Sequence, residues 1–393
     1  MSDKNNNTLK PVWHRVKFGD VVRQCKEKAD PETSGLERYI AGDHMDTDDL
    51  RLRRWGEIGS GYLGPAFHMR FKPGQVLYGS RRTYLRKVAV ADFEGICANT
   101  TFVLEPKNPN ELLPEFLPFL MQTEAFNAFS VKNSKGSVNP YINFSDLARF
   151  EFALPPIKDQ KDIALSLSCV DGMIGSLQEA ERAARNVFES TAKEFFESSS
   201  NKWPRRRIDE VSLFVTNGFV GKSAQHYVAE GGVPYLVSKN VRRNRLKLDE
   251  VTYISEEFHH SSKKSQLLEG DILTVQSGHI GETAVVPKEY AGANCHALII
   301  TRPDPKQLDP YFATYYLNSA VGQRRLSQLV IGSTIQHLNT SDLKKLDIPQ
   351  PNIEEQKSIS ALLSSIASDQ GLLAKRIEDA TRLRLQLLAE VFA

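Results

Sequence analysis

The chain has 393 residues, enough for two or three domains that each bury their own core. Its apolar content of 40% and charged content of 25% are ordinary for a globular protein, and no apolar run is long enough to cross a bilayer. The formal net charge of +2 excludes a polycation that coats nucleic acid indiscriminately. The polar, asparagine-rich first ten residues hold no signal-peptide core, so we expect a cytoplasmic protein without a membrane partner.

The sequence repeats itself with a shift of 196 residues. The shift relates Gly136-Ser137 to Gly332-Ser333, Asn143 to Asn339, Asp146 to Asp342, Pro155 to Pro351, and Gln160 to Gln356. A period this long is not that of a solenoid repeat, and it indicates a duplicated unit of a domain plus a helix. Because the middles of the two copies diverge, we expect a protein that reads two different things in one fixed geometry.

Short β-type runs bounded by turn signals occur at corresponding places in each copy. The expected strands include 76–78, 88–90 and 101–104 in the first copy, and 271–275, 284–286 and 297–301 in the second. A helix is expected after each set, over 114–129 and 310–329. This order predicts a duplicated α/β (α+β) domain with a substantial sheet.

Prolines then end each sheet, and an apolar heptad pattern follows. The expected seam positions are Ile163, Leu167, Val170, Ile174, Leu177, Ala184, Phe188 and Phe195, and then Ile359, Leu363, Ile366, Leu373, Ile377, Ala380, Leu387 and Val391. Polar residues interrupt the seams at Glu181, Thr191, Gln370 and Arg384, where they can fix register and partner choice. A long amphipathic helix is poorly stable alone, so we expect the two to pair as an antiparallel coiled coil. Recruitment of outside partners by the same helices is compatible with this pairing.

The expected organisation is therefore domain 1 over 11–155, helix 1 over 156–200, domain 2 over 201–350 and helix 2 over 351–393.

Motifs for catalysis are missing from the sequence. Gly221-Lys222-Ser223 resembles the end of a phosphate-binding loop, but Thr216 stands where that loop needs glycine. Asn139-Pro140-Tyr141 lacks the second proline of an amino-methyltransferase segment, and no glycine-rich cofactor loop precedes it. The nine histidines and four cysteines have no metal-ligand spacing. We expect no catalytic residue, no metal and no cofactor in this chain.

The helix starts carry a family resemblance. Leu-Pro-Pro-Ile-x-x-Gln-Lys at 154–161 and Pro-Gln-Pro-Asn-Ile-x-x-Gln-Lys at 349–357 each lead from a globular unit into a heptad helix. With the segments 71–79 and 267–273, this duplicated order resembles the specificity subunit of type I restriction–modification systems. The resemblance covers almost the whole chain.

The resemblance implies two target-recognition domains that each read one half of a split, asymmetric sequence in double-stranded DNA. The coiled coil would act as a ruler for the gap between the half-sites. Two modification subunits would dock on this frame and supply adenine methylation that depends on S-adenosylmethionine, and motor-nuclease restriction subunits can join them. The chain itself would be a non-catalytic specificity subunit.

Candidate DNA contacts come from clustered basic residues and from a polar turn at equivalent places in both copies. Arginine suits guanine, asparagine and glutamine suit adenine, and lysine more often holds phosphate. The candidates are Arg51, Arg53, Arg54, Arg81, Arg82 and Tyr84 in domain 1, and Lys239, Asn240, Arg242, Arg243, Gln276, Ser277 and His279 in domain 2. Gly136-Ser137 and Gly332-Ser333 could be phosphate-binding turns or plain turns.

Two other functions stay open at this point. One is a two-domain DNA-binding or adaptor protein that acts without a methyltransferase. The other is a single-chain enzyme with an unrecognised site, which the missing cofactor loop argues against.

Overall fold

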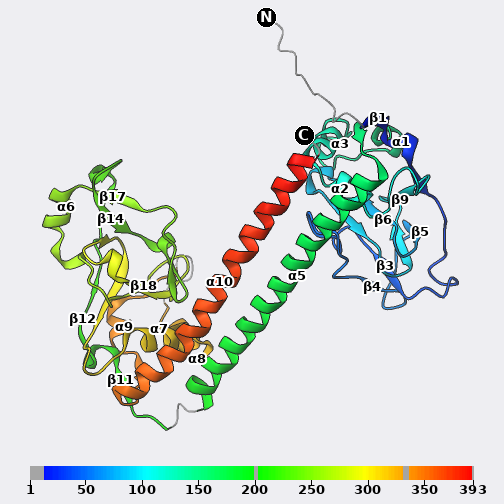
Figure 1. Ribbon diagram of the computed structural model, residues 1–393. Coiled ribbons are helices and arrows are strands. Elements are labelled where there is room, and N and C mark those ends of the chain that lie inside the picture. Colours follow the sequence, from blue (N-terminus) through cyan, green and yellow to red (C-terminus); the bar gives the residue numbers. More distant parts are fainter. Residues whose placement is uncertain (1–12, 199–201, 331–335, 392–393) are drawn as a thin grey trace, which may run out of the picture. The chain divides into compact units, whose positions relative to one another are not determined.

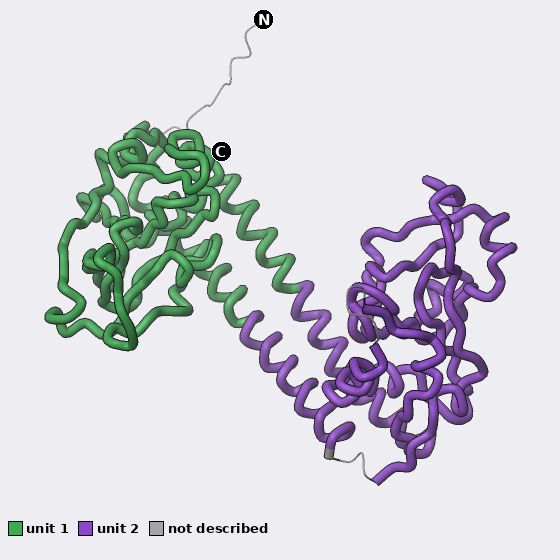
Figure 2. Tube along the Cα trace, turned by 180° about the vertical axis from the view of Figure 1, so that it is seen from behind, with its two compact units in different colours: residues 1–177, 376–393 green, residues 178–375 purple. Residues whose placement is uncertain are grey.

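The computed structural model describes residues 13–198, 202–330 and 336–391. The chain forms two compact units (Figures 1 and 2). Unit 1 comprises Met1–Leu177 and Arg376–Ala393, and unit 2 comprises Gln178–Lys375. Among the described residues, no helix combines the length and the apolar character that a membrane span requires.

Unit 1 is built on a four-stranded antiparallel sheet of order β2-β9-β6-β7. Its strands are β2 (Val22–Cys25), β9 (Thr101–Pro106), β6 (Val76–Gly79) and β7 (Val88–Val90). Both faces are buried: Val76 and Tyr78 point into the core beneath the helices, whereas Leu77 between them points into a second core. This burial explains why the strands are apolar at successive positions rather than at alternate ones.

The second core of unit 1 lies between this sheet and another, of order β4-β3-β8-β5. Its strands are β4 (Gly56–Glu57), β3 (Arg38–Ile40), β8 (Gly95–Ala98) and β5 (Phe67–Phe71). The β3–β8 pair is parallel and the others are antiparallel. The remaining short elements are β1 (His14–Lys17), α1 (Phe18–Val21), the 3-10 helix η1 (Thr83–Leu85), α4 (Phe144–Leu147) and β10 (Glu151–Leu154).

Unit 2 repeats the first sheet strand for strand, in the order β12-β21-β18-β19. These strands are β12 (Ser212–Asn217), β21 (Leu298–Pro303), β18 (Ile272–Val275) and β19 (Thr283–Val285). The second sheet differs, with the order β13-β17-β14-β20, although one parallel pair, β14–β20, is again present. Its strands are β13 (Tyr227–Val228), β17 (Thr252–Ile254), β14 (Val233–Leu236) and β20 (Asn294–Cys295). The duplication thus keeps the sheet next to the helices and varies the other one.

Other elements of unit 2 are short. They are β11 (Arg205–Arg207), β15 (Val241–Arg242), β16 (Arg245–Leu246), α6 (Glu256–Ser261), α9 (Thr340–Lys344) and β22 (Asp347–Pro349), with the 3-10 helices η3 (Ile208–Glu210), η4 (Ala224–His226), η5 (Ser238–Asn240), η6 (Lys263–Ser265) and η7 (Lys288–Tyr290).

The helix expected in each copy after the first sheet is in fact two helices, and this prediction is corrected. Over 114–129 the chain forms α2 (Leu117–Met121) and α3 (Glu124–Lys132), and over 310–329 it forms α7 (Pro310–Asn318) and α8 (Ala320–Leu329). The breaks fall at Thr123 and Ser319, which occupy the same position in the two copies of the repeat. Each has an extended backbone, and its hydroxyl accepts a hydrogen bond from the third residue of the next helix. A capping residue inside an apolar run therefore divides the helix.

The two predicted long helices are α5 (Ile157–Lys193), which a π-helical turn (Glu194–Ser198) extends, and α10 (Ile353–Val391). All sixteen expected seam residues are buried or half-buried. In unit 1 the beginning of α5 packs with the end of α10, where Leu167 and Leu388 share a core. In unit 2 the end of α5 packs with the beginning of α10, where Ala192 and Leu363 share a core (Figure 2). The predicted antiparallel pairing is confirmed.

One glutamine anchors the start of each long helix. Gln160 is fully buried, and its Oε1 accepts from the Leu113 amide at 2.8 Å while its Nε2 donates to the carbonyls of Glu111 and Pro155, each at 2.8 Å. Gln356 makes the equivalent three bonds, to Asp309, Gln307 and Pro351, each at 2.9 Å. These bonds satisfy buried backbone groups and fix each helix to its domain.

Candidate nucleic-acid interface

The turn after β6 in unit 1 is held by its backbone and leaves its charged side chains in solvent. We call residues 80–84 the Arg81 turn. Ser80 is buried, and its carbonyl accepts from the Ile142 amide at 2.9 Å, while the Arg82 amide donates to the Pro140 carbonyl at 2.6 Å. Arg82 has a left-handed backbone (φ 50°), which is uncommon for a residue other than glycine. The fixed backbone leaves the exposed side chains of Arg81, Arg82 and Tyr84 at the surface.

A second turn, residues 135–141, lies against the Arg81 turn, and we call it the Lys135 turn. Lys135 and Tyr141 close it with two backbone bonds of 2.7 and 2.8 Å, and Gly136 supplies a positive φ of 90°. The Lys135 ammonium lies 2.8 Å from Asp146, and this hydrogen bond holds the pKa of the Asp146 carboxyl below its usual value. The structure therefore brings the Gly136-Ser137 motif beside the predicted arginines.

Residues of both turns line a hollow of about 350 Å³. Arg81, Arg82, Lys87, Thr100 and Asn139 contribute to this lining, and Asp43 is its one acidic residue. Three cations and several uncharged donors in one hollow suit an anionic, polar ligand such as a DNA backbone. Lys87, Thr100 and Asn139 are not among the predicted contacts. Lys87 belongs to a basic run and Asn139 to the Asn139-Pro140-Tyr141 segment, but only the fold brings them to the Arg81 turn.

The remaining candidates of domain 1 lie in the segment 46–54 and are partly committed to the protein. Arg53 pairs with Asp49 at 2.8 Å, and Arg54 pairs with Asp46. The Arg51 guanidinium lies over Gly175 of α5 and donates to the Asp171 carbonyl at 2.6 Å. Arg51 therefore joins the domain to the helix, which argues against a DNA contact for its guanidinium. Surface pairs like those of Arg53 and Arg54 are weak enough to open for phosphate.

The equivalent turn of unit 2 follows β18. The Leu338 amide donates to the Gln276 carbonyl at 3.0 Å, and this bond is the repeat counterpart of that between Ile142 and Ser80. Ser277 and His337 stand where Arg81 and Tyr141 stand in unit 1, and Ser277 Oγ lies 2.8 Å from His337 Nδ1. Ser277 and His279 are exposed. The same backbone geometry thus presents different side chains. Gly332-Ser333 lies outside the described residues.

Two candidates of domain 2 are buried and have structural roles. Gln276 is 4% exposed and donates to Asn217 Oδ1 at 3.1 Å, and Asn240 is 1% exposed. The Asn240 side chain accepts from the Val237 amide and donates to the carbonyls of Lys247 and Glu250, at 3.0 to 3.2 Å. Their amides are used inside the fold, so the structure argues against base contacts by either residue.

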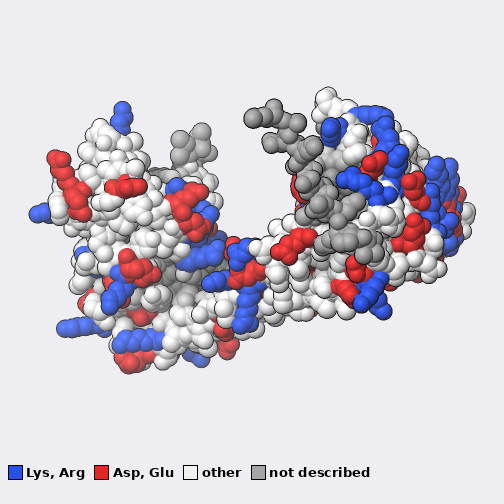
Figure 3. All heavy atoms as spheres, turned by 45° about the horizontal axis from the view of Figure 1, so that its top comes forward, with Lys and Arg blue, Asp and Glu red and all other residues white. Residues whose placement is uncertain are grey.

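The basic candidates of domain 2 lie on or beside the hairpin of β15 and β16, which packs on β19. Lys239 is exposed and lies 3.3 Å from Glu250, while Arg242 donates to the Val241 carbonyl at 2.8 Å. Arg243 is exposed and lines a hollow of about 410 Å³ that residues of α5 and α8 also line. These three come from the segment 239–243, which includes β15. On the face shown in Figure 3, Lys and Arg are interspersed with Asp and Glu over both units.

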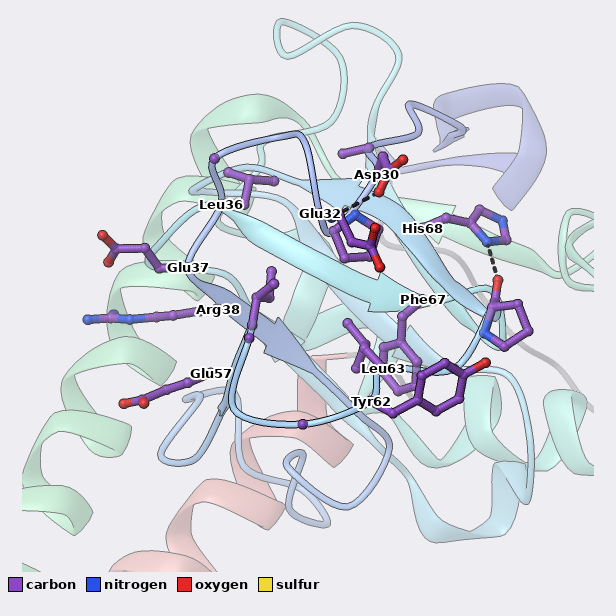
Figure 4. A pocket seen from close by; sticks show the side chains of 18 of the residues that line it. Asp30, Glu32, Leu36, Glu37, Arg38, Glu57, Tyr62, Leu63, Phe67 and His68 are labelled. Atoms are coloured by element: carbon purple, nitrogen blue, oxygen red, sulfur yellow. Dashed lines mark hydrogen bonds between the residues drawn. The ribbon is translucent and has the colours of Figure 1, made fainter.

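Another hollow in unit 1, of about 1430 Å³, has a different character (Figure 4). Loops 28–38 and 55–68 line it. Glu37, Arg38 and Glu57 extend to one side of it, while Tyr62, Leu63 and Phe67 lie together on another. Four carboxylates, those of Asp30, Glu32, Glu37 and Glu57, repel phosphate. This hollow is therefore not assigned to the interface.

The catalytic look-alikes have structural explanations. Pro140 of Asn139-Pro140-Tyr141 supplies the carbonyl that fixes Arg82. The helix after Gly221-Lys222-Ser223 is a single 3-10 turn, η4, too short to present several amides to a phosphate. Within the described part of the chain, no group of His, Cys, Asp and Glu could hold a metal ion.

Comparison with known proteins agrees with this duplicated architecture. The chain matches the family of the type I restriction modification DNA specificity domain twice, over residues 13–183 and 200–382. The chain therefore belongs to the family of type I restriction–modification specificity subunits.

Among curated proteins, two from Methanocaldococcus jannaschii are similar. The type I restriction enzyme MjaVIII specificity subunit is 25% identical over 293 residues, covering 70% of this chain and 68% of that protein. The putative MjaX specificity subunit is 24% identical over 381 residues, covering 91% of this chain and 85% of that protein. Among solved structures, the type I restriction-modification S subunit from M. genitalium has the same fold, with a TM-score of 0.66 at 17% identity, covering 99% of this chain and 98% of that one.

Proposed function

We propose that this chain reads a split, asymmetric sequence in double-stranded DNA, with units 1 and 2 each reading one half-site. The observation that carries this proposal is the equivalence of the Arg81 and Ser277 turns. Each is fixed by the same backbone bond, Ile142 to Ser80 and Leu338 to Gln276, yet they offer Arg81 and Tyr141 in one unit and Ser277 and His337 in the other. Unlike side chains on a shared backbone would read unlike base pairs.

The helix pair is proposed to set the gap between the half-sites. At 1.5 Å per residue, the 37 residues of α5 and the 39 residues of α10 correspond to lengths of about 55 to 60 Å. Two readers on a duplex must meet their sites at a defined distance and rotation, so a fixed spacer selects the permitted gap. Inside the pair, Gln370 donates to the Ala184 carbonyl at 3.0 Å, which fixes the register in unit 2.

Two modification subunits are proposed to dock on the outer faces of the helix pair. Each unit exposes large apolar side chains there: Leu165, Met173, Leu383 and Leu385 in unit 1, and Val187, Leu362 and Leu372 in unit 2. Exposed apolar side chains on both copies of a duplicated frame suit two identical partners. Those subunits would bind S-adenosylmethionine and methylate adenine, restriction subunits would join the same assembly, and this chain would contribute specificity without catalysis.

Selection from a random double-stranded DNA library by the chain copurified with its modification subunits tests this function. The expected product is two unlike short motifs separated by a constant gap. A single uninterrupted motif would contradict the two-reader assignment. Specific binding by a chain that recruits no modification subunit would favour the adaptor function instead.

A further inference from the structure

A ring of hydrogen-bonded side chains links the helix pair of unit 1 to the predicted reading loops. Its centre is Arg384 of α10, whose side chain is only 7% exposed. Arg384 binds the Asp171 carboxylate of α5 through two nitrogens, and its Nη2 also donates to Gln122 Oε1. One guanidinium thus joins both long helices to the end of α2. A buried, multiply bonded arginine has little freedom to move.

The ring continues from Gln122 to the loops. The Gln122 carbonyl accepts from Arg86 Nη2 at 2.7 Å, and Arg86 Nε donates to Asp48 Oδ1 at 2.8 Å. Arg86 directly follows η1, whose first residues belong to the Arg81 turn, and its backbone is left-handed (φ 51°). Asp48 belongs to the segment 46–54, whose Arg51 donates back to the Asp171 carbonyl at 2.6 Å. The ring therefore closes at Asp171, the residue that Arg384 binds.

Unit 2 has no equivalent of this charged ring in its described residues. By the shift of 196 residues, the repeat counterpart of Asp171 is Ala367 and that of Arg384 is Phe188. Phe188 packs edge-on against Tyr315, with ring centroids 5.7 Å apart. Asn318, the counterpart of Gln122, still holds a loop, because its Nδ2 donates to Asn244 Oδ1 at 2.7 Å. The same junction is thus apolar in one unit and ionic in the other.

We propose that Asp171 and Arg384 are positioning residues for sequence reading by unit 1. They fix the Arg81 turn and the segment 46–54 to the helix pair, so that the reading side chains keep one orientation on the DNA. This inference rests on the proposed function, because it assigns the ring to one of two half-sites. The half-site read by unit 2 then serves as an internal control.

The residues of unit 2 at the equivalent positions define the variant that tests this proposal. The double variant Asp171→Ala/Arg384→Phe gives unit 1 the residues that unit 2 uses, so it opens the ring at Arg384 without leaving a lone buried charge. The bond from Arg51 to the carbonyl of residue 171 is a backbone contact and stays. Binding is measured for the chain with its modification subunits, on the selected target and on targets with one base pair changed. For the unaltered chain, each change in either half-site should weaken binding by about 10- to 100-fold. In the double variant, this discrimination should fall at least about threefold in one half-site and stay unchanged in the other.

A glycine pair supplies a subtler variant. An added Cβ at Gly175 would lie 2.2 Å from Arg51 Nη2, so Gly175→Ala must displace the Arg51 arm of the ring; at Gly172 nothing lies within 4 Å. Gly175→Ala should weaken discrimination in the same half-site, and Gly172→Ala should not.

Each result is decisive. If the unaltered chain selects no split target, the proposed function fails, and the ring has no half-site to act on. If the unaltered chain reads both half-sites and the double variant reads them equally well, the inference is overturned. Equal losses in both half-sites would also overturn it, because they would assign the ring to general stability. A matching thermal transition and equal copurification of modification subunits would exclude misfolding as the cause of a one-sided loss.

Discussion

At the scale of residues, the interface depends on which polar groups the fold leaves available. Arg81 and Arg82 are exposed on a fixed backbone, whereas Asn240 and Gln276 are buried with their amides bonded inside unit 2. Composition cannot separate these cases, because an amide that suits adenine suits a backbone carbonyl equally well. Only tertiary contacts decide between capping a loop and reading a base.

We propose that Arg82, which is exposed and lines a hollow with Lys87, contacts phosphate, so Arg82→Ala should weaken DNA binding by the complex for every sequence tested. The plot of log affinity against log salt concentration should become shallower by about 0.9, the value for one lost phosphate contact. Arg23→Ala is the control, since Arg23 is exposed but pairs with Glu105 away from this turn. An unchanged affinity and slope for Arg82→Ala would remove this residue from the interface.

The Lys135 turn should be sensitive to acid through Asp146. Its pKa lies below the ordinary value of 3.8, chiefly because of the hydrogen bond from Lys135. The stabilisation is therefore complete above pH 3.8 and is lost as the pH falls through the lower pKa of the folded state. Asp146→Asn should be less stable than the unaltered chain at neutral pH, and the difference should shrink in acid. Denaturant titrations across this pH range measure it; a difference independent of pH would refute the ion pair.

At the scale of elements, the two long helices are stabilised at their starts by Gln160 and Gln356. Gln160→Ala should lower the free energy of unfolding by about 1–3 kcal/mol, because it leaves buried backbone groups unpaired. Lys161→Ala changes an exposed neighbour and should stay within about 0.5 kcal/mol. Chemical denaturation compares the two variants. Equal, small effects would show that the three bonds of Gln160 do not stabilise the helix start.

Local signals predicted the long helices, because heptads and prolines act within a few turns of chain. They failed at Thr123 and Ser319, where one hydroxyl cap divides an apolar run that otherwise indicates a single helix. They also missed much of the second sheets, whose strands have as few as two residues and pair across long separations. From the sequence, Arg51 is assigned to DNA. Its actual partner, Asp171, lies 120 residues further along the chain, where local sequence signals cannot reveal the contact.

At the scale of the whole molecule, a duplicated unit explains both the constancy and the divergence of the chain. The helix-side sheet, the glutamine anchors and the capped breaks recur, while the second sheet and the turn side chains differ. Shared framework with unlike reading loops is what a split asymmetric target requires.

Inserting seven residues into both α5 and α10 should lengthen the gap between the half-sites and leave the half-sites themselves unchanged. A heptad preserves the seam, since the apolar pattern repeats every seven residues. Library selection with the lengthened chain measures the gap. An unchanged gap would remove the ruler role from the helix pair.

The most direct test of the central claim is single-molecule mapping of adenine methylation in DNA from cells that carry this gene and its modification genes. The map is compared with that from cells lacking only this gene. We predict a split, asymmetric methylated motif that disappears on deletion. Identical maps, with the motif retained when the gene is absent, would contradict the assignment of this chain as the reader.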